Sequence, residues 1–320
     1  MIQKQAPSLR IDTHSTQPQL ATATGAGRKR KMKTNYKNLL FNADRQLRNG
    51  WWILIFIGFV GLTRFAYKPV THGLKELGLH KLWLEPAAFL FLLLATWACT
   101  RLRREPLSSV GYQLDRRWFS EIALGTLLGV GTILAAVAMI WAIGGVRFEL
   151  NPARSAGTLL TGLYIFLFVA LMEETLCRGF IFQRLLDGVG IWPAQIVMAS
   201  LFALGHWGNP GMEGSTELVA TLDLFLGAVL LGLAYLRTRS LALPVGLHLG
   251  WNWTQGHVLG FGVSGYDHAG WWQPVFQGKA EWLTGGAFGP EASLFSPLVS
   301  LVMIFLLWRW KGSVAAPALA

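Results

Sequence analysis

The amino-acid sequence predicts an all-α polytopic membrane protein with about eight transmembrane helices and a buried Glu/His/Asn site. Of its 320 residues, 52% are hydrophobic and only 14% are charged, whereas soluble domains contain about 25% charged residues. No soluble surface can hide that surplus of apolar side chains. The 15 tryptophans are typical of a chain with many membrane–water boundaries, where amphipathic rings collect.

Eight segments of the chain are candidates for membrane crossing, which requires about 20 mostly apolar residues. They are 51–67, 84–100, 119–144, 158–186, 191–207, 217–236, 241–261 and 292–310. Gly and Pro interrupt the fifth and the seventh, which is tolerated where the backbone faces protein or a cavity. We find no convincing internal repeat, which weakens the case for an inverted-repeat transporter.

Residues 1–50 form a basic region that we expect to be a disordered cytoplasmic tail with an amphipathic lead-in. The region contains ten Lys/Arg and two acidic residues, which supply +8 of the net charge of +11. Its densest basic run, residues 28–33, contains no aromatic residue, which argues against nucleic acid and favours anionic membrane lipids as the partner. The lead-in is predicted from apolar residues at helical spacing, namely Leu39, Leu40, Ala43 and Leu47. We expect residues 1–31 to be dispensable, with Met32 as an alternative start.

The distribution of Lys and Arg predicts the orientation. If the basic tail is cytoplasmic, 21 of the 28 Lys/Arg residues fall on that side, so both termini are expected to be cytoplasmic. We assign 51–311 to the transmembrane domain and 312–320 to a short C-terminal tail, with the bacterial cytoplasmic membrane as the expected location. Cys99 and Cys177 have no CxxC or Cys/His neighbours and are interpreted as packing residues.

Three of the predicted spans contain polar groups that are costly within a membrane and therefore indicate function. From predicted cytoplasmic helix ends, the three groups lie at depths of about 20, 22 and 16 Å when counted at 1.5 Å per residue. We therefore expect them to converge in one cavity. The residues are Glu173, Glu174 and Arg178 in the fourth span, His206 in the fifth, and His248 and Asn252 in the seventh.

Spacing within the helices assigns different tasks to these groups. Glu174 and Arg178 are four residues apart with the acid first, the favourable order for an ion pair within a helix. Glu173 projects about 100° away from Glu174, so it can point into a site while Arg178 holds Glu174. Two imidazoles with carboxylates can bind a divalent metal or polarise a water molecule, with a Glu as general base.

The three motifs resemble those of the CPBP family of intramembrane proteases, also called the CAAX-prenyl-protease and bacteriocin-processing, or Abi, family. The family pattern is EExxxR on one membrane helix, FxxxH on the next, and HxxxN or HxxxD further on. The resemblance covers residues 157–256, so the N-terminal region and the 262–291 loop lie outside it. The matching residues are Glu173, Glu174 and Arg178, then Phe202 and His206, then His248 and Asn252.

The resemblance implies an intramembrane endopeptidase, described as metalloprotease-like, that hydrolyses a prenylated CAAX-type or membrane-anchored peptide. It implies that Glu173 activates water and that His206 and His248 position that water or bind a metal. The metal would be divalent, with zinc as one candidate and Glu173 as a further ligand, and a metal-free water remains an alternative. Asn252 would form part of the oxyanion site, and Glu174 with Arg178 would hold the geometry.

The sequence also allows other functions. A GxSG string at 262–265 is similar to the serine motif of rhomboid proteases, but it falls in a predicted loop, and no later membrane helix carries a histidine. The sequence contains no HExxH zinc motif. A non-catalytic scaffold or bacteriocin-immunity protein is the second hypothesis, and a proton- or metal-coupled transporter is the third.

Overall fold

The computed structural model describes residues 39–312, except for the side chains of residues 80 and 81. Most of the basic region predicted at 1–50, including the alternative start at Met32, therefore lies outside the described residues, as do residues 313–320 of the predicted tail. Residues 39 and 40 are helical, and a turn closed by an isolated bridge between Phe41 and Leu47 follows them. Within it, the Asn42 side chain accepts a hydrogen bond from the Gln46 N–H (2.8 Å), an alternative to helical hydrogen bonding that Asn often supplies. The helical spacing of Leu39, Leu40, Ala43 and Leu47 therefore does not continue as a helix through residues 43 and 47, and the amphipathic lead-in as a whole stays a prediction.

Within residues 39–312, five helical segments are long and apolar enough to cross a membrane, and each overlaps a predicted span. The chain is therefore a mostly helical, polytopic membrane protein. The segments are α2 (Asn49–Glu76), Leu82–Leu102 within α3 (His80–Leu102), α4 (Arg116–Ala142), Ala156–Val189, which comprises α5 (Ala156–Arg178) and α6 (Phe180–Val189), and α8 (Gly214–Thr238).

The other three predicted spans correspond to shorter helices. They are α7 (Ile191–Gly205), α9 (Ala242–Trp253) and α11 (Phe295–Arg309), with 15, 12 and 15 residues. A perpendicular crossing needs about 20 residues, so the prediction of eight transmembrane helices is not confirmed. α7 ends at a turn that includes His206, and α9 continues into a π-helical turn, η2 (Thr254–Val258).

The predicted span 158–186 is not one continuous helix. α5 ends at Arg178, and α6 begins at Phe180 after a break at Gly179. A Cβ atom at Gly179 would lie 2.2 Å from the Thr175 carbonyl oxygen, so only glycine fits this sharp change of direction. Glu173 consequently lies five residues from the end of its helix, much closer than the depth estimate assumed.

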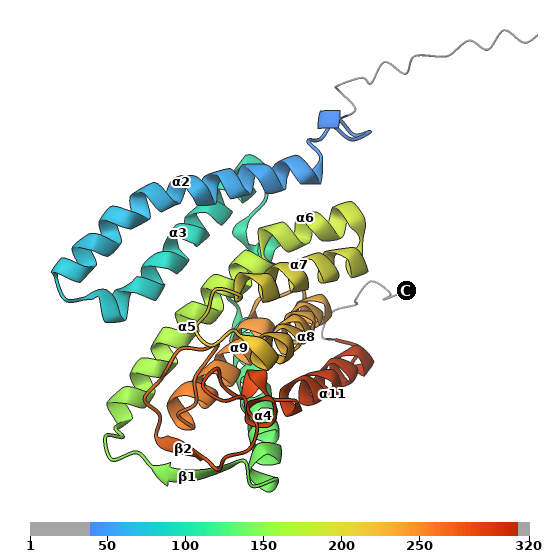
Figure 1. Cartoon of the computed structure of the whole chain (residues 1–320). Helices are drawn as coiled ribbons and strands as arrows, with labels where there is room; N and C mark the ends of the chain where they lie inside the picture. Colours follow the sequence, from blue (N-terminus) through green and yellow to red (C-terminus); the bar gives the residue numbers. More distant parts are fainter. Residues whose placement is uncertain (1–38, 313–320) are drawn as a thin grey trace, which may run out of the picture.

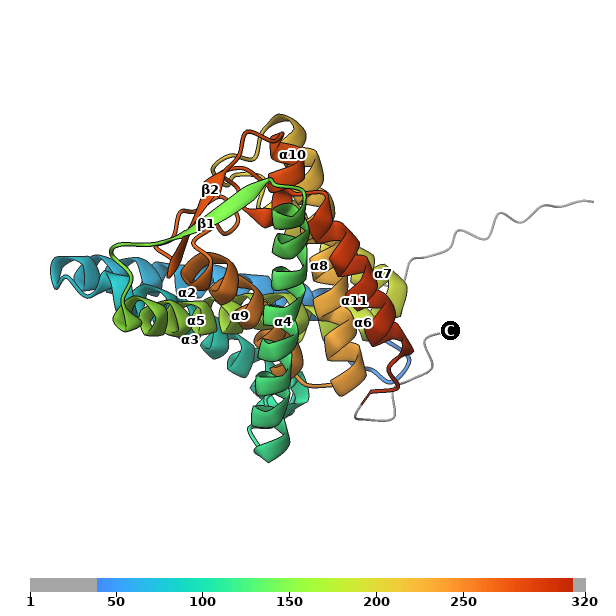
Figure 2. The same cartoon turned by 90° about the horizontal axis from the view of Figure 1, so that it is seen from below.

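The centre of the molecule is α9, whose residues from Ala242 to Asn252 are all buried. α4, α5 and α8 pack against α9, and α11 packs against α4 and α8. Figure 1 shows α2 and α3 as a hairpin to one side of this group, joined to it through α5 and α6. Seen from below in Figure 2, α4, α8 and α11 lie together, with the hairpin to the left.

α4 and α9 contact each other backbone to backbone through glycines spaced four residues apart. A Cβ at Gly129 of α4 would lie 2.1 Å from the Leu247 carbonyl oxygen, and one at Gly250 of α9 would lie 2.1 Å from that of Thr126. Gly125 and Gly246 are blocked in the same way. Small residues at this spacing let membrane helices approach closely without a hydrophobic driving force. The contact fixes the position of α9.

The all-α prediction misses a small two-stranded sheet. β1 (Val146–Leu150) pairs antiparallel with β2 (Trp272–Phe276), with Val146 opposite Phe276. The aromatic rings of Phe148 and Phe276 both pack on Phe261. Five-residue strands carry too little alternation to be recognised among apolar helices. The remaining short elements are η1 (Leu107–Val110), α10 (Glu281–Thr284) and η3 (Pro290–Ala292).

Candidate active site

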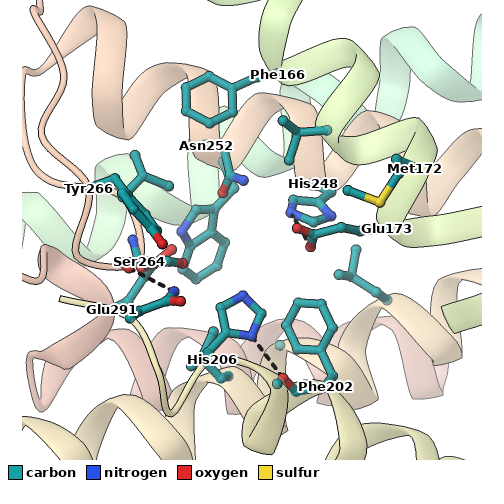
Figure 3. A pocket seen from close by; sticks show the side chains of 18 of the residues that line it. Phe166, Met172, Glu173, Phe202, His206, His248, Asn252, Ser264, Tyr266 and Glu291 are labelled. Carbon is teal, nitrogen blue, oxygen red and sulfur yellow. Dashed lines mark hydrogen bonds and ion pairs between the residues drawn. The ribbon is translucent and has the colours of Figure 1, made fainter. Parts of the chain in front are cut away.

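A cavity of about 510 Å³ lies among α3, α5, α7, α8, α9 and the segment that follows α9. Of the predicted site residues, Glu173, His206, His248 and Asn252 line it, as Figure 3 shows. The structure therefore brings together residues from three separate motifs. Glu174 and Arg178 do not line the cavity and lie behind it.

Glu174 and Arg178 form the ion pair predicted from their spacing, and both are fully buried. Arg178 Nη1 donates to Glu174 Oε1 at 3.0 Å, and the side-chain exposures are 2% and 0%. Arg178 Nη2 also donates to the Ala228 carbonyl of α8 (2.7 Å), and the guanidinium lies over the Phe202 ring of α7 at 5.4 Å. This one side chain therefore ties α5 to both α7 and α8.

His248 is held between the two glutamates. Its Nδ1 lies 2.9 Å from Glu174 Oε1, and its Nε2 lies 3.8 Å from Glu173 Oε2. A hydrogen bond from Nδ1–H to the Glu174 carboxylate fixes the tautomer and leaves Nε2 directed at Glu173. The 3.8 Å separation is too long for a direct hydrogen bond, but it leaves both atoms able to contact one small molecule such as water.

His206 is oriented by its own backbone. It is the residue that caps the C-terminus of α7, and its Nδ1 lies 2.8 Å from the Phe202 carbonyl oxygen. Because a carbonyl oxygen can only accept, Nδ1 carries the hydrogen and Nε2 is the atom free to act in the cavity. The Phe202 ring packs against both histidines, with centroids 4.7 Å from His206 and 6.4 Å from His248.

Asn252 lies one turn beyond His248 on α9 and is 8% exposed. Its side-chain amide forms no hydrogen bond with any of the residues described. An amide buried to this extent ordinarily has a partner, so Asn252 is available to a ligand in the cavity. It can both donate and accept hydrogen bonds, as recognition of a peptide group requires.

The side chains as placed do not fit a metal centre. A zinc site holds three or four protein ligands at about 2.0–2.3 Å. Within residues 39–312, no three His, Cys, Asp or Glu side chains are close enough together to hold one ion. The divalent metal expected on His206, His248 and Glu173 stays a prediction.

Three acidic residues at the cavity were missed by the sequence analysis, namely Glu85 of α3, Asp223 of α8 and Glu291 of η3. Asp223 and Glu85 could have been found, because each is an ionisable residue inside a predicted apolar span. Glu291 gave no such signal, since it lies at the end of the long loop. The fold of that loop is what brings Glu291 to the cavity.

Ser264 of the GxSG string also lines the cavity, although the sequence analysis placed it in a loop outside the family resemblance. Its backbone N–H and its hydroxyl donate to Glu291 Oε2 at 2.8 and 3.2 Å, and its carbonyl accepts from Asn209 Nδ2 (2.9 Å). None of the described hydrogen bonds joins Ser264 to a histidine. The residue therefore fastens the 259–291 segment over the cavity and does not form a Ser/His pair.

The same segment is fastened at its other side by His268. The His268 ring packs on Phe166 and on His257, with centroid separations of 5.1 Å in both cases. Burial, reinforced by the neighbouring His257, lowers the pKa of His268 to about 4. His268 is therefore neutral at pH 7 and packs as an apolar ring.

Comparison with known proteins supports the motif assignment. Neither the curated proteins nor the solved structures gave a match. Residues 155–254 match the family model described as type II CAAX prenyl endopeptidase Rce1-like. The matched range contains all three motifs and thus the four predicted residues of the cavity. Residues 155–254 are therefore similar to the Rce1-like CAAX protease family.

Proposed function

We propose that this protein is an intramembrane endopeptidase that hydrolyses a peptide bond in a prenylated CAAX-type or otherwise membrane-anchored peptide, using water activated by Glu173. The observation that carries the proposal is the geometry of Glu173 and His248. Glu173 Oε2 and His248 Nε2 lie 3.8 Å apart at the cavity, and Glu174 holds the imidazole in the tautomer that presents Nε2. A water molecule can be hydrogen-bonded by both atoms.

In the proposed reaction, Glu173 takes a proton from water as the water oxygen attacks the peptide carbonyl carbon. The Asn252 amide donates to the oxyanion that develops on the carbonyl oxygen. Glu173 then returns the proton to the leaving nitrogen as the C–N bond breaks, which yields a carboxylic acid and an amine. His206 positions the substrate or the water through its free Nε2, and Glu174 with Arg178 maintains the arrangement.

Glu173→Gln tests the proposal. It removes the general base but keeps the size of the side chain, so cleavage of a farnesylated CAAX peptide or a membrane-anchored leader peptide should fall at least a hundredfold, as loss of acid–base catalysis implies. Glu149→Gln is the matched control, because Glu149 lies on β1 with 55% of its side chain exposed. Both proteins are assayed in lipid nanodiscs, and their unfolding temperatures are compared. Unchanged turnover in well-folded Glu173→Gln protein would overturn the proposed chemistry, and a lack of cleavage by the unmodified protein would favour a non-catalytic scaffold.

A further inference from the structure

Two buried carboxyl groups lie where α8 and η3 pack against each other beside the cavity. Asp223 of α8 is 3% exposed, and Glu291 of η3 is 4% exposed. Their neighbours in the chain, Leu224 and Ala292, belong to one apolar cluster. No ion pair within residues 39–312 includes either acid. No Lys or Arg of the described chain lines the cavity, so no such side chain offsets the two groups.

Hydrogen bonds hold both carboxyl groups in place but leave part of their capacity unused. Asp223 contacts Ser296 Oγ at 2.9 Å and Ser300 Oγ at 3.1 Å, both on α11. Glu291 Oε2 accepts from the Ser264 N–H at 2.8 Å and lies 3.2 Å from the Ser264 Oγ. The two oxygens of a carboxyl group provide about four hydrogen-bonding positions. Each group therefore keeps at least one position for a ligand in the cavity.

At least one of the two carboxyl groups retains its proton at neutral pH. The charge of an ionised Glu291 acts on Asp223, and like charges in a buried site oppose the ionisation of both groups. Burial also raises the pKa of Glu291, which lies outside the membrane-crossing helices, although the Ser264 donors oppose this effect. The other titratable side chains at the cavity are Glu85, Glu173, His206, His248, Tyr266 and His268. Because a protonated carboxyl group is a hydrogen-bond donor, the pair can donate to an anion.

An independent observation shows that the cavity is built for a ligand. The Asn252 amide is buried and directed into the cavity, as Figure 3 shows, and it has no hydrogen-bond partner among the described residues. Its NH2 group is a further donor that carries no charge. A carboxylate suits such neutral donors, because hydrogen bonds to an ionised acceptor are about twice as strong as those between neutral groups.

We propose that Asp223 and Glu291 form a subsite for the C-terminal carboxylate of the substrate, with which the pair shares its proton. The inference rests on the proposed function and assigns specificity-determining residues to it. A CAAX-type peptide ends in a free carboxylate close to its prenylated cysteine. A cavity whose described lining has no Lys or Arg takes up this charge through O–H···O⁻ hydrogen bonds. A peptide without a free C-terminus at this place lacks the group that the subsite recognises.

Binding to the Glu173→Gln protein tests the subsite without requiring turnover. The probes are two farnesylated fluorescent CAAX peptides that are identical except that one ends in a free carboxylate and the other in an amide. Nanodiscs of zwitterionic phosphatidylcholine prevent the membrane from selecting by charge. We expect the free-acid peptide to bind at least tenfold more tightly than the amide at about pH 6, where the peptide carboxylate is already ionised. Equal affinities, or tighter binding of the amide, would overturn the inference.

The pH dependence identifies the shared proton. The preference for the free acid should fall several-fold between about pH 6 and about pH 9, because the pair loses its proton while the peptide stays ionised. Asp223→Asn with Glu291→Gln, both in the Glu173→Gln background, keeps the size of the side chains but removes their titration, so the preference should no longer depend on pH. Glu149→Gln in the same background is the matched control and should leave the fall intact. An undiminished fall in the Asn/Gln protein would also overturn the inference.

A spectroscopic measurement needs no variant of the pair. In infrared difference spectra of the Glu173→Gln protein, the band of a protonated carboxyl group should shift when the free-acid peptide binds and stay in place when the amide binds. Identical difference spectra for the two peptides would contradict proton sharing.

The subsite and the proposed function fail separately. Cleavage of both peptides by the unmodified protein at equal rates, with equal binding, would leave the protease proposal standing and remove the subsite. A pH-dependent preference for the free acid, with no cleavage of either peptide by the unmodified protein, would have the opposite meaning.

Discussion

Replacing Arg178 by alanine should destabilise the protein more than any comparable change at its surface. The substitution removes the ion pair with Glu174 (3.0 Å), the hydrogen bond to the Ala228 carbonyl (2.7 Å) and the contact with the Phe202 ring (5.4 Å). Removing one partner of a buried ion pair costs about 3–5 kcal/mol, because the remaining charge is stranded. His248 still contacts Glu174 Oε1 at 2.9 Å, so we expect a loss near the lower end, about 3 kcal/mol.

The matched control is Arg147→Ala. Arg147 pairs with Glu149 at 2.9 Å, but the two side chains are 63% and 55% exposed, and such surface pairs contribute about 0–1 kcal/mol. Unfolding is followed by tryptophan fluorescence of detergent-solubilised protein during heating and denaturant titration. Arg178→Lys should recover part of the loss, because it restores the charge but not the planar fork of donors.

Glu173→Gln belongs in the same series. The described ion pair of Glu173 is the 3.8 Å contact with His248, so this variant should retain a stability close to that of the unmodified protein while it loses activity. Equal destabilisation by Arg178→Ala and Arg147→Ala would refute the structural role of the buried pair. Equal destabilisation by Arg178→Ala and Glu173→Gln would show that structural and chemical roles are wrongly divided between the two glutamates.

Two further predictions concern α9 and the loop above the cavity. Gly250→Ala places a methyl group against the Thr126 carbonyl oxygen and should cost at least about 1–3 kcal/mol of unfolding free energy through overpacking. The control Gly131→Ala, whose added methyl group meets nothing within 4 Å, should be neutral or stabilising. Equal stabilities of these two variants would contradict the close contact between α4 and α9. The pKa of His268 is lowered to about 4 in the packed loop, below its value of about 6.5 in the unfolded chain. Packing of the loop is therefore fully favoured above pH 6.5 and weakens as the pH falls from 6.5 to 4. Cleavage within 259–291 by an added protease should therefore increase as the pH falls over that range in the unmodified protein but not in the His268→Phe variant. Cleavage that does not depend on pH in either protein would refute this role of His268.

Much of the membrane architecture follows from hydrophobicity, because long apolar runs have few alternatives in a chain with so few charges. The positions of α2, α3, α4, α5 and α8 were predicted for this reason. The break after Arg178 was not, since the apolar character continues across it and only the steric demand at Gly179 ends the helix. The small sheet escaped prediction because its strands are short and lie in different loops.

The residues of the site that have a local sequence pattern were likewise predicted, and those that long-range folding brings to the cavity were not. The four cavity residues Glu173, His206, His248 and Asn252 were identified because their spacing is local and their polarity stands out in apolar helices. Their catalytic roles remain predictions. Glu291 reaches the cavity only because η3 follows a long excursion through β2 and α10, and no local pattern encodes that return path.

The glycine contact between α4 and α9 means that the limits of the family match are not the limits of a folding unit. α9 carries His248 and Asn252, and α4 ends at residue 142, before the matched range 155–254 begins. A fragment cut at residue 155 would leave the glycine face of α9 without the surface that it fits, and lipid chains cannot reproduce backbone contact at that distance. Any minimal version of this protein designed for expression, grafting or crystallisation therefore has to begin upstream of Arg116.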